Sequence, residues 1–401
     1  MDLDAFRMLL TPTGQAALHE ATRILADGAD PVAAASALRR GHPADLTAAA
    51  LTQASLRRRA EAKFGPEAAV MYFTPHGLEQ ATRPEVAAHR ATRIRAETLP
   101  DGGPTVLDVC CGIGGDLLAL ARAGCAVDAV DLDPLTVEVA RANAAALGLS
   151  SLASVRTGDA ALADPGGYGL LFADPARRGA RGRTFDPMAY SPAWPVVLEL
   201  VARAPAACLK VAPGIPYELI PEGAEAEWVS YRGEVKEAAI WAGMGTEGRR
   251  ATLLPSGVTL TASGAEAETG PVRRYLYEPD GAAVRAHLVA EVAAMVSGHL
   301  LDPRIAYITS DRLVRTEWAS CYEVTDVMPF SLKGLRAALR ERRVGAVTIK
   351  KRGSAVDVER LRKDLRLSGD NSVVIVLTRI GERPYVLLCQ APEVVRTSTD
   401  G

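Results

Sequence analysis

The chain has 401 residues, of which 48% are hydrophobic and 23% charged, and its formal net charge is −2. This length is enough for about two to four domains, and the composition excludes an intrinsically disordered protein. The near-zero net charge excludes a globally basic nucleic-acid binder, so any nucleic-acid contact must be regional. The sequence has no apolar run of transmembrane length and no C-x-x-C pair among its six cysteines, and its first residues, MDLDAFRMLL, are unlike a signal peptide. We therefore expect a cytoplasmic protein without a membrane segment or a metal site.

The N-terminal region is rich in alanine and leucine and predicts a helical domain over residues 1–71. Glycine and proline turns separate its helix-compatible stretches, which are 13–27, 31–40 and 45–64. After this domain, the segment Thr82-Arg83-Pro84-Glu85 offers a threonine cap, a proline in the first turn and an early acidic residue. We expect a further helix over about 83–97.

From residue 105 the sequence alternates between apolar strands, glycine turns and helices. This alternation predicts a doubly wound α/β domain over residues 72–244. The expected parallel strands are 105–110, 126–132, 154–157, 170–173 and 206–212. Two extended runs on either side of Gly233 are expected to form an antiparallel hairpin at the sheet edge.

A Gly-, Thr- and Ser-rich stretch at 245–271 marks a domain boundary. Beyond it we expect two α+β domains, a ferredoxin-like one over 245–320 and another over 321–401. The first of these should contain a helix over about 282–297.

The C-terminal region also carries an asymmetric charge. Twelve basic and five acidic residues lie between Lys333 and Asp370, which gives this segment +7 and leaves −9 for the rest of the chain. A compact basic module is typical of an RNA-docking domain, because lysine and arginine neutralise phosphates. The expected substrate-binding residues here are Lys350, Lys351 and Arg352. The alternative is an ordinary basic helix face.

The strongest chemical signal runs from Val106 to Asp116, where a strand ends in a glycine turn that opens a helix. Glycines there let the backbone approach a ligand, and the helix N-terminus favours an anionic group. Nineteen residues after Gly112, Asp131 ends the second strand, where a carboxylate can accept both hydroxyls of a ribose. The pair predicts a nucleoside cofactor. A plain strand-to-helix connection, with Asp131 or Asp133 capping the next helix, is the alternative.

Four motifs in chain order resemble those of the class I S-adenosylmethionine-dependent methyltransferases. They are D-x-C-C-G-x-G-G-D, V-D-L-D-P, Gly158-Asp159-Ala160 and Ala173-Asp174-Pro175. A dinucleotide such as NAD is disfavoured, because Leu117 stands where its G-x-G-x-x-G fingerprint requires glycine. The resemblance implies a Rossmann-like sheet of seven strands and S-adenosylmethionine as the cofactor.

The resemblance also implies individual roles. Asp108 would orient the amino-acid end of the cofactor, Asp131 would hold the ribose and Asp159 would accept from the adenine amino group. The implied cofactor-binding set is Asp108, Cys110, Gly112, Gly114, Asp131, Leu132, Asp159 and Ala160. No metal ligand is expected.

Asp174-Pro175-Ala176-Arg177-Arg178 stands where amino-methylating members of this family carry an acid or amide followed by Pro-Pro-aromatic. Asp174 is therefore the expected catalytic, substrate-facing residue. The stacking aromatic is absent, which puts base N-methylation in doubt. We expect Pro175, Arg177 and Arg178 to bind substrate, the arginines through phosphates. For the arginines, a solvated loop is the alternative.

A closer resemblance is to bacterial methyltransferases with a C-terminal THUMP-like domain. Besides the glycine motif and the Asp174 motif, three segments carry this resemblance, namely 78–82, 232–237 and 349–353. A distant resemblance to the entry helix of trimethylguanosine synthases lies at 82–89, but their Ser-Pro-Pro-Trp motif is missing. The closer resemblance implies an RNA substrate, tRNA or rRNA. The alternatives are a small-molecule or protein methyltransferase whose C-terminal domains serve assembly, and a non-catalytic RNA-binding protein with a vestigial cofactor fold.

Overall fold

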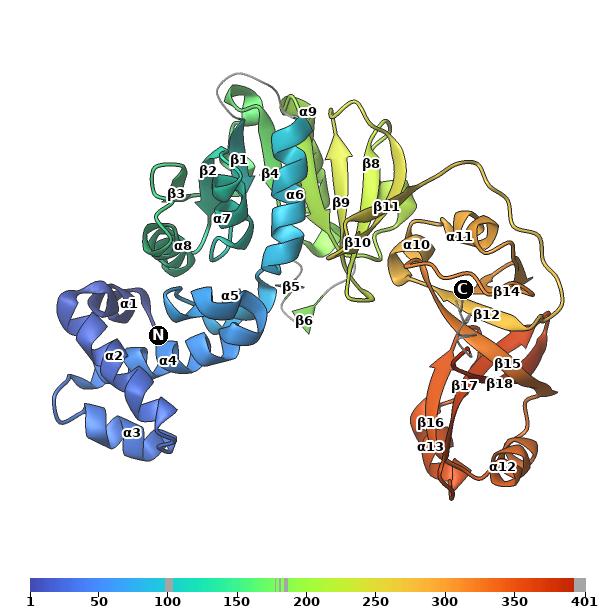
Figure 1. The fold of residues 1–401 in the computed structure, drawn as a ribbon. Coiled ribbons are helices and arrows are strands. Elements are labelled where there is room, and N and C mark those ends of the chain that lie inside the picture. The colour runs from blue at the N-terminus through green and yellow to red at the C-terminus, as the bar shows by residue number, and fades with distance from the viewer. Residues whose placement is uncertain (98–103, 177, 180–181, 184–186, 393–401) are drawn as a thin grey trace, which may run out of the picture. The chain divides into compact units, whose positions relative to one another are not determined.

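The structure, a computed structural model, describes residues 1–97, 104–176, 178–179, 182–183 and 187–392 (Figure 1). The chain forms two compact units. The first unit comprises Met1–Glu227 and Glu237–Gly248, and the second comprises Trp228–Lys236 and the residues from Arg249 onward. The division between them runs through the hairpin of β8 (Glu225–Tyr231) and β9 (Glu234–Ala242). The division of the sequence into four domains stays a prediction.

The first unit begins with helices. The three expected ones are confirmed as α2 (Pro12–Ala26), α3 (Pro31–Leu38) and α4 (Ala44–Phe64). Two short helices, α1 (Leu3–Leu10) and α5 (Pro75–Gln80), were not expected. Each is capped by its preceding side chain: Asp2 accepts from the amide of Ala5, and Thr74 accepts from that of Gly77.

The α/β part of the first unit follows the predicted alternation. Its strands are β1 (Thr105–Val109), β2 (Ala126–Asp131), β3 (Ala153–Thr157), β4 (Leu170–Ala173) and β7 (Ala207–Val211). Its helices are α6 (Pro84–Glu97), α7 (Gly115–Arg122), α8 (Pro134–Ala146) and α9 (Trp194–Arg203). Short strands β5 (Arg178–Gly179) and β6 (Gly182–Arg183) pair in the segment that follows β4.

The strand order in this part of the sheet is β8-β9-β7-β4-β1-β2-β3. β1 pairs in parallel with β2 and β4, and β9 pairs antiparallel with β7. The carboxyl ends of β1, β2, β3 and β4 therefore meet at one edge, where ligands bind in open α/β sheets.

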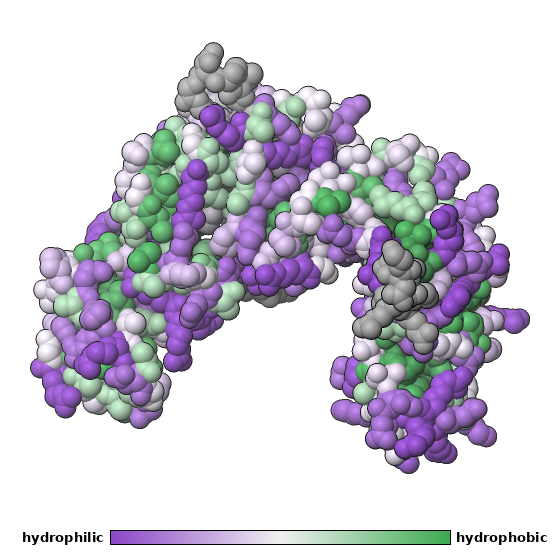
Figure 2. Space-filling model, in the orientation of Figure 1, coloured by the Kyte–Doolittle hydropathy of each residue, from purple (hydrophilic) through white to green (hydrophobic). Residues whose placement is uncertain are grey.

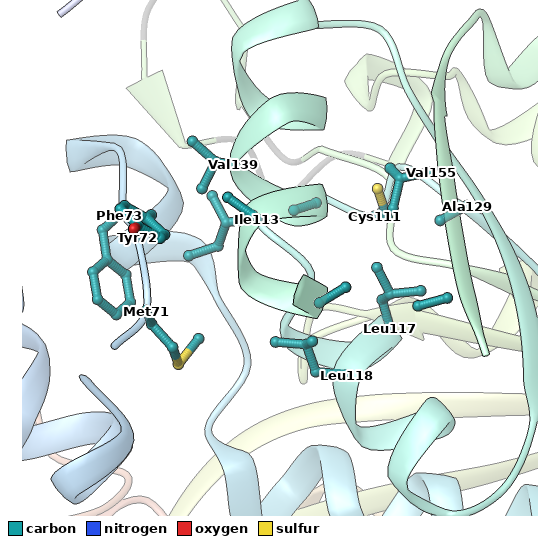
Figure 3. Close-up of a cluster of buried hydrophobic side chains, with 14 of the residues drawn as sticks. Met71, Tyr72, Phe73, Cys111, Ile113, Leu117, Leu118, Ala129, Val139 and Val155 are labelled. Carbon is teal, nitrogen blue, oxygen red and sulfur yellow. The ribbon is translucent and has the colours of Figure 1, made fainter. Parts of the chain in front are cut away.

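One hydrophobic core joins the N-terminal helices to this sheet. Phe6 of α1 packs edge-on against Tyr72, with ring centroids 5.6 Å apart. Figure 3 shows Tyr72 and Phe73 beside Ile113 of the glycine turn. The buried side chain of Asn143 on α8 binds both sides of this contact, because its amide donates to the carbonyls of Tyr72 and Ile113 at 3.0 and 2.9 Å. The helical segment thus helps to fix the glycine turn.

In the second unit, β10 (Gly248–Leu254) and β11 (Val258–Thr261) form an antiparallel hairpin that extends the sheet from β8. Seven further strands form a separate sheet in the order β13-β14-β12-β15-β18-β17-β16. They are β12 (Tyr275–Pro279), β13 (His299–Asp302), β14 (Ile305–Ser310), β15 (Ala319–Pro329), β16 (Val344–Lys351), β17 (Asn371–Ile380) and β18 (Arg383–Gln390). The helices are α10 (Gly281–Arg285), α11 (Val289–Met295), α12 (Leu332–Glu341) and α13 (Val358–Leu365).

Alternation along β17 divides the buried side chains of this second sheet between two cores. Ile375 and Leu377 pack with Leu335 of α12 and Leu361 of α13, whereas Val376 joins the core on the other face. The helices α12 and α13 therefore cover one face of the C-terminal strands and leave their polar sides outward.

Two expectations for this half of the chain were wrong. The Gly-, Thr- and Ser-rich stretch at 245–271 contains β10 and β11, so β8 is flanked by β10 and the β8-β9 hairpin is not at the sheet edge. The seven strands expected of the class I sheet are all present, and β10 and β11 extend this sheet to nine. The helix expected over 282–297 is two helices, because the backbone turns at His287, whose φ is +54°.

Candidate active site

A cavity of about 620 Å³ lies at the carboxyl ends of β1, β2 and β4. Five of the predicted site residues line it, namely Cys110, Gly112, Asp131, Asp174 and Pro175. The other predicted cofactor residues lie outside its lining and are Asp108, Gly114, Leu132, Asp159 and Ala160. Arg177 lies outside the described residues, and of Arg178 only the backbone, in β5, is described.

The glycine turn after β1 depends on left-handed backbone conformations. Gly112 and Gly114 have φ values of +57° and +92°, and Cys110, which is not a glycine, has +66°. The amides of Cys110 and Cys111 both donate to the carbonyl of Val130, at 2.8 and 3.2 Å, and this tethers the turn to β2. A Cβ atom added at Gly112 would meet nothing within 4 Å, so the turn presents open space above its backbone.

Of Asp131 and Asp133, it is Asp133 that takes the helix-capping role that the sequence left open between them. The carboxylate of Asp133 caps α8 by accepting from the amides of Leu135 and Thr136 at 3.2 Å each. That of Asp131 accepts from the amides of Gly112 at 2.9 Å and Asp133 at 3.1 Å. Burial raises the pKa of Asp131, although the two N–H donors oppose this shift. The half-buried Asp131 carboxylate therefore faces the cavity.

Asp108 is fully buried in β1, and neither of its carboxylate oxygens has a hydrogen-bond partner among the described residues. Burial raises the pKa of Asp108 well above its usual range, and the nearby carboxylates of Asp116, Asp174 and Asp131 add to the shift. An orphaned buried carboxyl is costly and calls for a donor that the described residues do not supply.

The wall opposite the sheet comes from α5, which sequence reasoning missed. Thr74, Pro75 and Gly77 line the cavity. A Cβ atom added at Gly77 would come within 2.3 Å of the Ile113 side chain, so this glycine lets α5 approach the glycine turn closely. The detectable signal was Thr74-Pro75, a threonine cap followed by a proline at the first helical position.

Lys210 is the second functional residue that sequence reasoning missed. It is the penultimate residue of the buried strand β7, and its side chain is only 5% exposed. Its ammonium contacts the Asp174 carboxylate and lies 3.9 Å from that of Asp116. Burial disfavours the charged form, yet the carboxylates of Asp174, Asp116 and Glu237 raise the pKa of Lys210 above its usual value. The signal was a lone lysine inside an otherwise apolar strand.

The ionic network around Lys210 includes a residue of α6. The guanidinium of Arg90 binds Asp116 at 2.6 Å and also pairs with Glu237 of β9. Thr82 donates its hydroxyl to Asp116 at 2.6 Å. The expected threonine cap of α6 was therefore wrong: this helix begins at Pro84, and Thr82 serves the buried carboxylate.

Carboxylates outnumber cations in this cluster. Two cations, Arg90 and Lys210, face three acids, Asp116, Asp174 and Glu237, and the unpaired Asp108 lies nearby. A site with this excess favours a ligand of net positive charge.

The predicted RNA-contacting residues of β16 separate into two groups. The ammonium of Lys350 and the guanidinium of Arg352 lie 2.9 and 3.6 Å from the carboxylate of Glu278. Lys351 is exposed and donates to the carbonyl of Val356 at 3.2 Å. Further exposed basic residues lie on and just after the helices, at Lys333, Arg340, Lys363 and Arg366. Figure 2 shows hydrophilic residues gathered over α12 and α13.

Two general features are absent from the described residues. No group of three or more His, Cys, Asp and Glu side chains is placed to hold a metal ion there. No helix in the described ranges is both long and apolar enough to cross a membrane.

Comparison with known proteins identifies the chemistry. Two curated relatives, from two strains of Mycobacterium tuberculosis, are each 37% identical over 345 residues, which cover 81% of this chain and 91% of the relative. Both are described as S-adenosylmethionine-dependent methyltransferases. The chain belongs to this family. S-Adenosylmethionine is its cofactor, and the protein is a methyltransferase.

Family models match three parts of this methyltransferase. A domain of unknown function matches residues 2–60, a methyltransferase domain matches 106–167 and a THUMP-like domain matches 319–391. A solved structure from Porphyromonas gingivalis W83 shares the fold, with a TM-score of 0.73, 22% identity and coverage of 88% of this chain and 92% of that one. The expected class I fold with a THUMP-like domain at its C-terminal end is confirmed.

The residues of the cavity fit S-adenosylmethionine. The cofactor carries a sulfonium and an ammonium, which suit the excess of carboxylates, and the buried Asp108 has no hydrogen-bond donor in the part of the chain that the structure describes, a donor that an ammonium can supply. When bound, the cofactor supplies an electrophilic methyl group. The chain's own residues then have to bind it, align the acceptor and exclude water.

Proposed function

We propose that this methyltransferase acts on RNA, tRNA or rRNA, with the second unit binding the RNA and Asp174 contacting the acceptor group. The observation that carries the proposal is the THUMP-like segment, whose helices α12 and α13 present exposed basic residues outward. Phosphate contacts from such a surface supply sequence-independent affinity. The alternative is a small-molecule or protein substrate.

Salt-dependent binding tests the RNA proposal. Replacing Lys333, Arg340, Lys363 and Arg366 by alanine should weaken binding of single-stranded RNA. It should also flatten the slope of log affinity against log salt by about 0.7 for each side chain that contacts a phosphate. The matched control removes four exposed arginines of the N-terminal helices, which are Arg39, Arg40, Arg58 and Arg59. Equal slopes for the two variants and the wild type would favour a small-molecule or protein substrate over RNA.

This test needs the whole chain, because a truncation cannot isolate the THUMP-like segment. A chain that ends at Ser320 would lose β15, which pairs with β12 over Tyr275–Pro279. The remaining strands β12, β14 and β13 would then expose a sheet edge and one face of a core.

Within the first unit, we propose that Asp131 binds the ribose of the cofactor. Asp131→Ala should then weaken S-adenosylmethionine binding by about 1.5–3 kcal/mol, the range for hydrogen bonds to a charged group. Isothermal titration calorimetry measures this loss. Asp30→Ala is the control, because it removes the α3 cap at a cost of about 1 kcal/mol in stability, at a residue that does not line the cavity, and should leave the affinity unchanged. Equal affinity losses in both variants would refute the ribose role.

We propose that Asp108 binds the ammonium end of the cofactor. An unfolded chain ionises this group near its usual pKa, whereas the folded, ligand-free chain resists ionisation. The stability of the ligand-free protein should therefore fall as the pH rises above about 4, by up to about 1.4 kcal/mol per pH unit from this group.

Asp108→Asn should remove that dependence and also weaken S-adenosylmethionine binding at least about tenfold. Urea denaturation at pH 5 and pH 8 measures the first effect. If the stability difference between variant and wild type is the same at both pH values, the pKa of Asp108 is not raised in the folded, ligand-free protein.

A further inference from the structure

The Lys210–Asp174 pair has an asymmetric position at the cavity. Asp174 lines the cavity and its side chain is 27% exposed, whereas Lys210 is 5% exposed and does not line it. Lys210 thus approaches Asp174 from the protein interior. Its contact with Asp174 and its 3.9 Å approach to Asp116 leave the Lys210 ammonium between two carboxylates.

Other groups around this pair are mainly acidic or neutral. Asp116 is already bound by Arg90 and Thr82, and Asp108 has no partner among the described residues. Burial raises the pKa of the Cys110 thiol, which keeps it neutral. Among the residues whose side chains the structure describes, Lys210 is therefore the cation in direct contact with Asp174, and it balances that carboxylate at the cavity edge.

The charge balance has a consequence for methyl transfer. As the reaction proceeds, a bond forms between the acceptor atom and the methyl carbon, and the bond from methyl to sulfur breaks with its electron pair remaining on sulfur. The sulfonium becomes a neutral thioether, and the acceptor's proton passes to water. An unbalanced anion beside the sulfonium stabilises the reactant more than the transition state, in which the positive charge is dispersed, and so slows the transfer.

We propose that Lys210 is a positioning residue that fixes Asp174 and balances its charge, so that Asp174 binds the acceptor group and not the sulfonium. The inference rests on the proposed function in placing the cofactor's sulfonium in this cavity with Asp174 at the acceptor side, but it does not require that the acceptor be RNA. Asp116, the last residue of the glycine motif, is then the second carboxylate that holds the Lys210 ammonium. Asp116 also binds Arg90 and so connects Lys210 to α6.

The ratio of the affinities for two ligands measures the charge balance at Asp174 directly. S-Adenosylmethionine and S-adenosylhomocysteine differ by a methyl group and one positive charge at sulfur. Lys210→Met leaves Asp174 unbalanced and should shift the ratio about tenfold toward S-adenosylmethionine. Asp174→Asn leaves Lys210 unbalanced and should shift it in the opposite direction. The double variant should return to the wild-type ratio, and calorimetry with both ligands on the full chain gives all four values.

Two further variants separate charge from folding. Lys210→Gln keeps a polar group at the site without the charge and should behave as Lys210→Met does, whereas Lys210→Arg should keep the wild-type ratio. Arg93→Met is the matched control, because Arg93 is another buried cation of the first unit and binds the carboxylates of Glu225, Glu227 and Glu97 at 2.5, 3.0 and 2.8 Å. It should lower stability and leave the ligand ratio unchanged.

Turnover supplies a second readout. With total RNA as the acceptor, Lys210→Met should bind S-adenosylmethionine more tightly and yet transfer methyl groups at least about tenfold more slowly. A defect of folding alone would weaken both. A wild-type ligand ratio in folded Lys210→Met and Lys210→Gln, or a shift that persists when Asp174→Asn is added, overturns the inference. If the ligand affinity ratios of the wild type, the two single variants and the double variant follow the prediction but the wild-type protein methylates no RNA, the RNA proposal fails and the role of Lys210 stands.

Discussion

Replacing Asp174 by alanine should reduce methyl transfer by about 10²- to 10³-fold, the size of effect seen when one hydrogen-bonding group is removed from a transition state. S-Adenosylhomocysteine binding should stay close to that of the wild type, because the other cavity residues that we propose to bind the cofactor are intact. Single-turnover measurements with radiolabelled methyl donor, together with calorimetry, separate the two quantities.

The ion pair with Lys210 requires a control for the Asp174 variant. Alanine removes the partner of a buried ammonium, so Asp174→Ala should also lose stability. Asp174→Asn keeps the shape and should lose less stability but nearly as much turnover. If Asp174→Asn retains near wild-type turnover at a temperature where it is folded, Asp174 does not contact the acceptor.

Arg90→Met should destabilise the protein by about 3–5 kcal/mol, the cost of removing one partner from a buried ionic network. Arg90 is 3% exposed, and without it the carboxylates of Asp116 and Glu237 lose their shared cation. Chemical denaturation of the full chain measures this loss. Arg95→Met, at an exposed position on the same helix, should change stability by no more than about 0.5 kcal/mol.

A small effect at Arg90 would mean that Asp116 and Glu237 are stabilised by water or by protonation. The pairing of α6 with the sheet would then contribute little to the orientation of Lys210. A large effect accompanied by an unchanged ligand ratio would assign Arg90 to folding alone.

The fold was largely predictable because its signals are local. The strands β1, β4 and β7 are mainly apolar, and glycines follow β1, α7, α8 and β3, so the alternation can be read without tertiary information. Prediction failed where local composition was misleading. The stretch 245–271 has the composition of a linker, yet Ala251 and Leu260 bury their side chains in the β10-β11 hairpin.

The candidate site was predictable in part, for a related reason. Asp131 and Asp174 follow apolar strands, so their position at one sheet edge follows from topology. The contacts of Lys210 do not, because its partners Asp174 and Asp116 lie 36 and 94 positions away in the sequence and meet it only after the sheet has formed. A lysine within a buried strand signals a buried partner but does not identify it.

The chemistry and the substrate class can be tested together in cells. Nucleoside mass spectrometry of tRNA and rRNA should be compared between a strain with the gene and one without it. We expect one methylated nucleoside to disappear on deletion, to return with the wild-type gene and to remain absent with the Asp174→Ala variant. Identical methylation of every tRNA and rRNA fraction in the two strains would contradict an RNA methyltransferase.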